Sequence, residues 1–299
     1  VLDLPPADIY VLELSSFQLE TTTNLNAKAA TILNISEDHL DRYEDMQAYL
    51  VAKQRIFQGC EFAVINRDDA ATIPPFSIAY KSFGLNLDRK GWGLLTMAGE
   101  TWIGFGDKPY VAASELKIKG LHNLANSMAA LALVQSQLID VFDAKILQAL
   151  KAFAGLDHRC QWVACKQGVE YYNDSKGTNV GSTLAAVLGL GATISGKIWL
   201  LAGGDGKGQD FSLLPEPCQP YLAKTLLFGR DAKIIKRALS ASLECELFDD
   251  LSQAFAFAQQ HAQAGDIVLL SPACASWDQY KNYVERGQHF CSLVEAVHE

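Results

Sequence analysis

The sequence predicts an α/β protein built from one or two domains. The chain has 299 residues, of which 49% are hydrophobic, enough for a core in each of two domains. Short apolar runs alternate with stretches of helical periodicity, which is typical of a mostly parallel sheet flanked by helices. The alternation restarts after FAGLDHRCQW, so we expect a first domain over residues 1–155 and a second over residues 156–299, with the boundary near Gly155.

The first half begins with strands and a helix. Apolar runs at residues 9–14, 29–34 and 62–66 have the length of buried strands. Residues 45–57 repeat apolar side chains at helical spacing, so we expect a helix between the second and third strands.

A glycine-rich segment at residues 77–111 interrupts this pattern. Its spacing of glycines predicts antiparallel hairpins, which would form a β-insert on the first domain. Two helices are expected to follow, at residues 122–137 and 143–153.

The second half returns to an α/β pattern. Apolar runs at residues 198–202, 225–228 and 267–270 predict buried strands, and VEYY before NDSK reads as another. The stretch DLSQAFAFAQQHAQAG predicts an amphipathic helix with Gly265 as its C-cap.

Composition excludes several classes of partner. A formal net charge of −9 argues against nucleic acid. No apolar run reaches the ~18 residues of a membrane span, and no secretory signal is recognised. Seven cysteines without a C-x-x-C pair favour reduced thiols in a cytoplasmic protein. The first residue is Val1 rather than Met, so we expect a piece of a longer protein.

The stretch SEDHLDRY, residues 36–43, places His39 among three acids after an apolar run. Ser36 and the acids suit the first turn of a helix, which is the commoner use of such residues. The alternative is a divalent cation at the carboxyl end of a strand, where open α/β sheets bind ligands. Glu13 would be a carboxylate ligand to the same cation as His39. The alternative is that Glu13 lies at the solvent-exposed end of its strand.

Further polar stretches follow predicted strands or begin predicted helices. In LHNLANSMAALAL, amides can cap the helix or recognise a purine edge. NDSKGTNVGST can be a turn with an N-cap or an anion site, and LLAGGDGKGQDF resembles a phosphate loop without matching G-x-x-x-x-G-K-[ST]. In LLSPACASWDQYKN, we expect Cys274 to be packed rather than nucleophilic, because no basic partner is evident.

Taken in order, these stretches resemble the Mur ligases, and most closely the branch that adds D-glutamate. The resemblance spans essentially the whole chain and includes VLELSSFQLE, AKQRIF and GLDHR. It implies a central ATP-binding α/β domain with a β-insert, followed by a Rossmann-like C-terminal domain that binds the amino acid. It also implies ATP, Mg²⁺, D-glutamate and UDP-N-acetylmuramoyl-L-alanine as ligands, and a role in cytoplasmic peptidoglycan synthesis.

The resemblance also assigns site residues. Lys53, His39 and Lys176 would be catalytic, and Glu13, His39 and Lys53, the last as a carbamate, would hold Mg²⁺. Tyr283 stands where we expect phenylalanine. The residues for D-glutamate would be Thr178, Lys207, Ser276 and Tyr283, and those for the nucleotide Asn123, Asn126, Arg159 and Asp174.

The implied reaction has two steps, through an acyl phosphate. The family pattern requires an N-terminal UDP-binding domain and a G-x-x-x-x-G-K-[ST] loop, and neither is present in these 299 residues. We therefore expect a truncated central domain and no ligase activity from this chain alone. Two alternatives stay open: another Mur ligase or folylpolyglutamate synthase, and an inert remnant that binds ligands without turnover.

Overall fold

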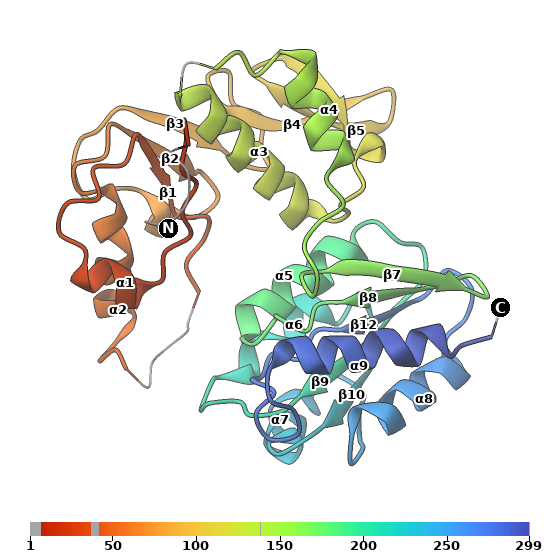
Figure 1. Cartoon of the computed structure of the whole chain (residues 1–299). Helices are drawn as coiled ribbons and strands as arrows, with labels where there is room; N and C mark the ends of the chain where they lie inside the picture. The colour runs from red at the N-terminus through yellow and green to blue at the C-terminus, as the bar shows by residue number, and fades with distance from the viewer. Residues whose placement is uncertain (1–6, 37–41, 138, 299) are drawn as a thin grey trace.

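The computed structural model describes residues 7–36, 42–137 and 139–298. These residues form two six-stranded sheets, each in its own lobe (Figure 1). The first six strands all belong to one sheet and the last six to the other. The predicted α/β class is confirmed, while the domain boundary near Gly155, between the last helix of one lobe and the first strand of the other, stays a prediction.

The first sheet has the strands in chain order, from β1 to β6. The first four pair in parallel, and β4, β5 and β6 pair antiparallel. The predicted hairpins are therefore confirmed for the last three strands, whereas β3 is parallel to both its neighbours. The bounds are β1 Ala29–Thr31, β2 Phe62–Asn66, β3 Tyr80–Phe83, β4 Trp92–Met97, β5 Glu100–Phe105 and β6 Lys108–Ala112.

Helices cover both faces of this sheet. The helix α3 (Leu121–Ser136) packs Leu124, Met128 and Leu131 in one core with side chains of β2 to β6, and α4 (Ala144–Ala152) borders that core. A second core, around Phe57, joins the 3₁₀ turn after α2 to β1 and β2. The remaining elements are α1 Ser16–Thr21, α2 Met46–Gln54, and the 3₁₀ turns Arg55–Phe57, Ala70–Thr72 and Ala113–Glu115.

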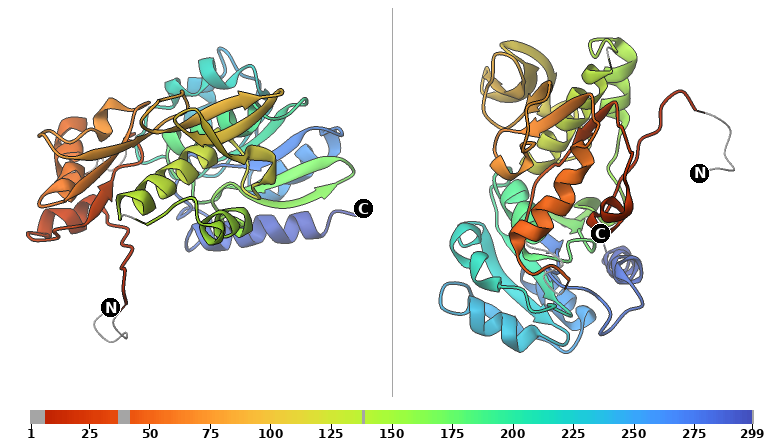
Figure 2. Two further views of the ribbon diagram at one scale, coloured as in Figure 1. Left: turned by 90° about the horizontal axis from the view of Figure 1, so that it is seen from above. Right: turned by 90° about the vertical axis from the view of Figure 1, so that its left-hand side faces the viewer.

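The predicted strand at residues 9–14 is wrong. These residues form no strand, and Val11 is 92% exposed while Ile9 is 55% exposed. The segment before α1 runs outward from its lobe in both views of Figure 2. The physical reason is the missing ladder: among the described residues β1 pairs only with β2, and no strand pairs with residues 9–14. An apolar run becomes a buried strand only where neighbouring strands accept its backbone hydrogen bonds.

The second sheet has the order β11-β10-β9-β12-β8-β7. All neighbours are parallel except β7 and β8. The strand β12 lies between β8 and β9, although it follows both of them in the chain. The order of the strands therefore reverses at this point, and open α/β sheets bind ligands at such a reversal. The bounds are β7 Gln161–Lys166, β8 Val169–Asn173, β9 Ile198–Gly203, β10 Leu222–Phe228, β11 Cys245–Leu247 and β12 Ile267–Leu270.

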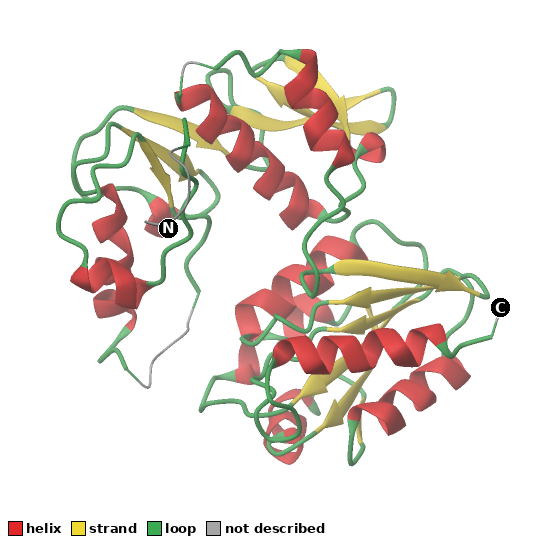
Figure 3. Ribbon diagram, viewed as in Figure 1, coloured by secondary structure: helices red, strands yellow, loops and turns green. Residues whose placement is uncertain are grey.

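Helices on both faces make the second sheet doubly wound (Figure 3). One core contains α5 (Val180–Gly191), α6 (Pro215–Cys218) and α7 (Ala232–Leu239), and the turn Phe211–Leu213 joins it. The other contains α8 (Leu251–His261) and α9 (Tyr283–Glu295).

The expected C-cap of α8 is wrong. The helix ends at His261, and its C-cap Ala262 is extended, so Gly265 lies beyond the cap. Gly265 has φ +94° and donates its N–H to the Gly168 carbonyl in the turn that leads into β12. The glycine is therefore used to begin a strand rather than to end a helix.

The seven cysteines, all within the described ranges, are free thiols. Among the helices that the structure describes, none is long and apolar enough to cross a membrane.

Candidate functional site

Three loops meet at the carboxyl edge of the second sheet, after β8, β9 and β12. Asp205 and Ala275 exchange two backbone hydrogen bonds of 2.9 Å, which join the loops after β9 and β12. Gln209 Nε2 donates to the carbonyls of Thr178, at 3.4 Å, and Ala273, at 3.3 Å. The three loops predicted from separate parts of the sequence are thus one connected surface.

Asp174 is the buried carboxyl beneath this surface. Its Oδ1 accepts the N–H of Cys160 at 3.0 Å, and its Oδ2 accepts the Ser271 hydroxyl at 2.7 Å. Burial raises the pKa of Asp174 to about 7, against the lowering effect of these hydrogen bonds. The carboxyl therefore ties the chain before β7 to the loops after β8 and β12, and it changes charge near neutral pH.

Lys176 is a partly buried cation in the loop after β8. Its Nζ lies 5.6 Å from the ring centroid of Tyr283, at the start of α9. Burial and the charge of Arg159 lower the pKa of Lys176, while the charge of Glu13 raises it. Glu13 precedes α1 in the first lobe, so the charge of a carboxylate in one lobe affects the pKa of a lysine in the other.

Lys207 is held by an unusual turn. Its φ is +50°, a conformation that costs energy for any residue with a side chain, and its N–H donates to Asp205 Oδ1 at 3.0 Å. Ser276 is 2% exposed, and its carbonyl accepts the N–H groups of Gln279 and Tyr280. Both residues therefore stand on backbone fixed by local hydrogen bonds.

The predicted nucleotide amides lie near the start of α3. Asn123 Nδ2 donates to the Lys119 carbonyl at 2.8 Å, and Asn126 is exposed. Neither amide is the N-cap, which is Gly120 and has no side-chain cap hydrogen bond. The neighbouring His122 packs on α5 of the other lobe: a Cβ built on Gly189 would lie 2.3 Å from His122 Nδ1. This end of α3 therefore contacts the second lobe.

The predicted metal ligands are only partly described. His39 lies outside the described residues. Lys53, on α2, has its Nζ 5.7 Å from the Tyr49 ring centroid, and Glu13 is exposed. Within residues 7–36, 42–137 and 139–298, no three His, Cys, Asp or Glu side chains gather as metal ligands. Carboxylate and carbamate oxygens are nonetheless the donors that Mg²⁺ prefers, so the chemistry of the predicted set suits that ion.

Ser36 does not cap α2, the first helix that the structure describes after it. The N-cap of α2 is Asp45, whose Oδ1 accepts the Ala48 N–H at 2.8 Å. Ser36 instead lies against α5: a Cβ built on Gly181 would lie 2.7 Å from Ser36 Cβ. The stretch SEDHLDRY therefore begins at the junction of the lobes.

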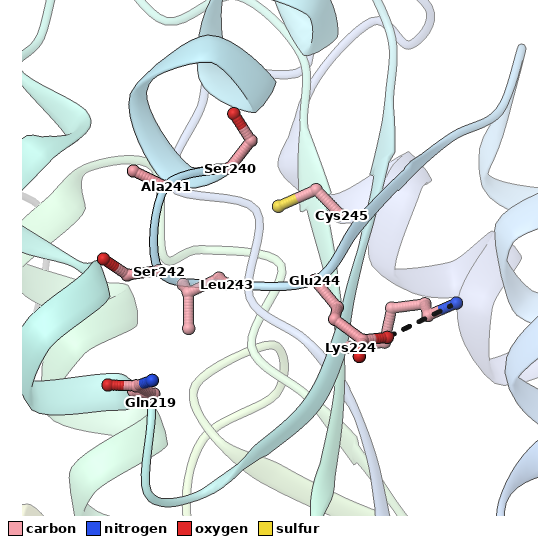
Figure 4. Close-up of a pocket in the computed structure, with 8 residues that line it drawn as sticks. All are labelled: Gln219, Lys224, Ser240, Ala241, Ser242, Leu243, Glu244 and Cys245. Atoms are coloured by element: carbon pink, nitrogen blue, oxygen red, sulfur yellow. Dashed lines mark ion pairs between the residues drawn. The ribbon is translucent and has the colours of Figure 1, made fainter.

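A second concave surface lies far from these loops, at the amino ends of β10 and β11 (Figure 4). It is an open groove of about 510 Å³, where Lys224 Nζ lies 3.9 Å from a carboxylate oxygen of Glu244. Its side chains include none of the predicted site residues.

Cys274 lies in the loop after β12 and is fully buried. Burial raises the pKa of its thiol to about 12. The expectation that Cys274 is packed rather than nucleophilic is therefore confirmed.

Comparison with known proteins identifies this arrangement. Residues 3–134 match the Mur ligase middle domain, and residues 158–274 match the Mur ligase, glutamate ligase domain. Over 99% of its length the chain is 52% identical to UDP-N-acetylmuramoylalanine--D-glutamate ligase of Pseudomonas aeruginosa, of which it covers 67%. The chain belongs to the Mur ligase family. The enzyme of the same name from Acinetobacter baylyi is 50% identical over 97% of this chain, and the match covers 66% of that enzyme.

Solved structures support the Mur ligase fold. MurF from Acinetobacter baumannii superposes with a TM-score of 0.67 at 18% identity, over 90% of this chain and 60% of its own. Folylpolyglutamate synthase/dihydrofolate synthase from Yersinia pestis gives 0.63 at 20% identity, over 90% and 62%. The chain thus spans about two thirds of the length of its curated Mur ligase relatives and somewhat less of these structures.

Sequence reasoning missed Arg286 of α9. Arg286, Ser175 and Ser271 are each 0% exposed; Arg286 donates to the Ser175 carbonyl, and the Ser271 hydroxyl donates to the Asp174 carboxylate. One signal was available for Arg286: it stands four residues before Phe290 and eight before Val294, on the apolar stripe of its helix. A charged residue in such a stripe indicates a buried polar contact.

Proposed function

We propose that this chain supplies the nucleotide-binding and amino-acid-binding parts of a ligase that joins D-glutamate to UDP-N-acetylmuramoyl-L-alanine with ATP. The observation that carries the proposal is the meeting of Lys176, Thr178, Lys207 and Ser276 on three adjoining loops at one sheet edge. The relatives at about 50% identity that bear this enzyme's name support the choice of substrate. The predicted cytoplasmic location suits this role in peptidoglycan synthesis.

D-glutamate is the ligand we assign to the second lobe. Its carboxylates need cations and hydrogen-bond donors, and Lys207 and the hydroxyls of Thr178 and Ser276 are of that kind. Tyr283 lies beside Lys176, and its ring also lies 6.0 Å from that of His158. The contact with an aromatic ring helps to hold the Lys176 ammonium in place.

The nucleotide is assigned to the junction of the lobes. Asn123 and Asn126 would face the base, Arg159 the phosphates and Asp174 the ribose. When bound, Mg²⁺ held by Glu13, His39 and carbamylated Lys53 would neutralise charge on the phosphoryl oxygens. Lys176 adds a cation from the second lobe, and the charge of Glu13 acts on it.

The reaction we assign proceeds in two steps. A carboxylate oxygen of the UDP-linked substrate attacks the γ-phosphorus of ATP, and ADP leaves. The amine of D-glutamate then attacks the acyl carbon, phosphate leaves, and the nitrogen loses a proton to form the amide. Lysine charges stabilise the phosphoryl oxygens, and closure of the lobes positions the reactants.

A binding experiment tests the proposal directly. We expect this chain to bind D-glutamate in calorimetric titrations, and to bind L-glutamate, L-lysine and diaminopimelate more weakly. Lys207→Met should weaken binding of D-glutamate by roughly 10-fold or more, because a charge-assisted contact contributes about 1.5–3 kcal/mol. Preference for diaminopimelate or L-lysine would favour another Mur ligase, and preference for L-glutamate would favour folylpolyglutamate synthase.

We also propose that these 299 residues do not catalyse the reaction by themselves, since they contain no G-x-x-x-x-G-K-[ST] loop for the β- and γ-phosphates. The assay supplies ATP, Mg²⁺, D-glutamate and UDP-N-acetylmuramoyl-L-alanine and follows phosphate release. Amide product formed by this chain alone would refute the statement. A thermal-shift titration with ADP and with D-glutamate completes the test, because a chain stabilised by neither ligand would have neither of the proposed binding sites.

A further inference from the structure

Arg286 is a cation buried in the second lobe without a carboxylate bonded to it. The side chain is 0% exposed on α9, and among the described residues none forms an ion pair with it. A buried arginine is costly unless hydrogen bonds satisfy it. The hydrogen-bond partners of Arg286 should therefore indicate what this buried side chain does in the structure.

Those partners are the backbones of two of the site loops. Arg286 Nη2 donates to the carbonyl of Ser175 at 2.8 Å and to that of Cys274 at 3.1 Å. Its Nε donates to Ser175 Oγ at 3.0 Å, and that hydroxyl donates to the Tyr283 carbonyl at 2.7 Å. One planar guanidinium thus spans the loop after β8, the loop after β12 and the start of α9.

The position of these contacts links them to the site. Ser175 lies between Asp174 and Lys176, and Cys274 lies two residues before Ser276. The guanidinium donates to one carbonyl of each loop and to the Ser175 hydroxyl, and a planar fork of donors is what arginine offers and lysine does not.

We propose that Arg286 is a positioning residue, which clamps the loops after β8 and β12 in the relative placement that binding of D-glutamate needs. The ligand part of this inference rests on the proposed function. The mechanical part concerns the two loops alone, and it is tested without any ligand.

The first measurement is amide hydrogen exchange of the 299-residue chain and its variants. The reporters are the N–H groups of Lys176, bonded to the His158 carbonyl at 3.0 Å, and of Ala275, bonded to the Asp205 carbonyl at 2.9 Å. In Arg286→Met, which keeps the length of the side chain but has no donors, we expect both amides to exchange at least 10-fold faster. The matched control is Val294→Ala, on the same helix and also 0% exposed, which should leave both reporters at the parent rate.

Two more variants sharpen the result. Arg286→Lys should resemble Arg286→Met, because the shorter lysine side chain ends one bond before the Nη2 position that donates to both carbonyls, and it lacks the Nε donor to Ser175 Oγ. Ser175→Ala, a smaller change that removes only the Oγ contacts, should loosen the same reporters to a lesser degree and serves if Arg286→Met does not fold. Reporters that exchange as slowly in the arginine variants as in Val294→Ala, or a lysine variant that behaves as the parent, would overturn the inference.

The second measurement is calorimetric titration with D-glutamate. We expect Arg286→Met to lose at least 10-fold in affinity and Val294→Ala to stay within about twofold, because only the former contacts the loops. If the parent binds and Arg286→Met binds equally well, the clamp has no role in binding. If the parent itself does not bind, the proposed function fails, whereas the exchange experiment still decides whether Arg286 holds the loops.

Discussion

At the scale of single residues, the site depends on polar groups whose surroundings differ from those of free side chains. Asp174 is buried and bonded to Cys160 and Ser271, while Lys176 is partly buried beside Tyr283 and Arg159. The sequence identified both residues as candidates, since each lies in the loop after a predicted strand. Their environment was not predictable, because it is made by residues distant in the chain.

The shifted pKa of Asp174 gives a pH-dependent stability. Burial raises the pKa to about 7 from 3.8, so the folded chain retains a proton that the unfolded chain has released. The contribution is favourable below about pH 4 and is lost as the pH rises through 7. Asp174→Asn removes this titration. Relative to the parent, the variant should therefore gain roughly 2–4 kcal/mol of unfolding free energy between pH 4 and 7.

Urea unfolding of both proteins at several pH values measures this difference. Val294→Ala is a suitable control, because it changes stability without removing a titrating group. A difference between Asp174→Asn and the parent that does not vary with pH would show that the carboxyl is ionised throughout.

At the scale of elements, the loops are shaped by the ends of the strands that precede them. The strand β9 ends at Gly203, with φ +132°, where a Cβ would lie 1.9 Å from the Phe228 carbonyl oxygen. Only glycine allows β9 to turn so close to β10. The glycine-rich sequence indicated a tight loop here, but not which glycine the fold requires.

A matched pair of substitutions tests this requirement. Gly203→Ala should destabilise the chain by roughly 2–4 kcal/mol, because the added methyl meets backbone that cannot move away. Gly208→Ala, in the same loop, should cost only about 1–2 kcal/mol, since its φ of +75° is strained but no atom lies within 4 Å of the added Cβ. Chemical denaturation measures both, and equal losses would contradict the close approach.

At the scale of the whole molecule, the two lobes meet through α3 and α5. His122 fills the space left by Gly189, and its Nδ1 is buried without a hydrogen-bond partner in the described structure. Burial lowers the pKa of His122 to about 4, opposed by a backbone hydrogen bond at Ala185. The junction therefore accepts the neutral imidazole and disfavours the charged one.

Acidification should weaken this junction. Above pH 6.5 the histidine is neutral whether the lobes are joined or apart. As the pH falls from 6.5 towards 4, protonation stabilises only the separated or unfolded state, at a cost to the joined state of roughly 1–3 kcal/mol. Small-angle scattering should show the chain expanding in this range, and His122→Gln should remove that expansion. An unchanged radius of gyration down to pH 4 would contradict the prediction.

The sequence by itself determined the α/β class, most strands of both sheets, the order of the polar loops and the resemblance to Mur ligases. These features follow from local periodicity and from motifs, each of which lies within a few consecutive residues. The strand predicted from the sequence at residues 9–14 is wrong, because a strand needs neighbouring strands that its own residues do not encode. Only the tertiary structure decided that β12 lies between β8 and β9, that Arg286 bridges two loops, and that His122 rests on Gly189. These are contacts between residues far apart in the chain, and their energy comes from burial and hydrogen bonds that exist only once the sheets are assembled.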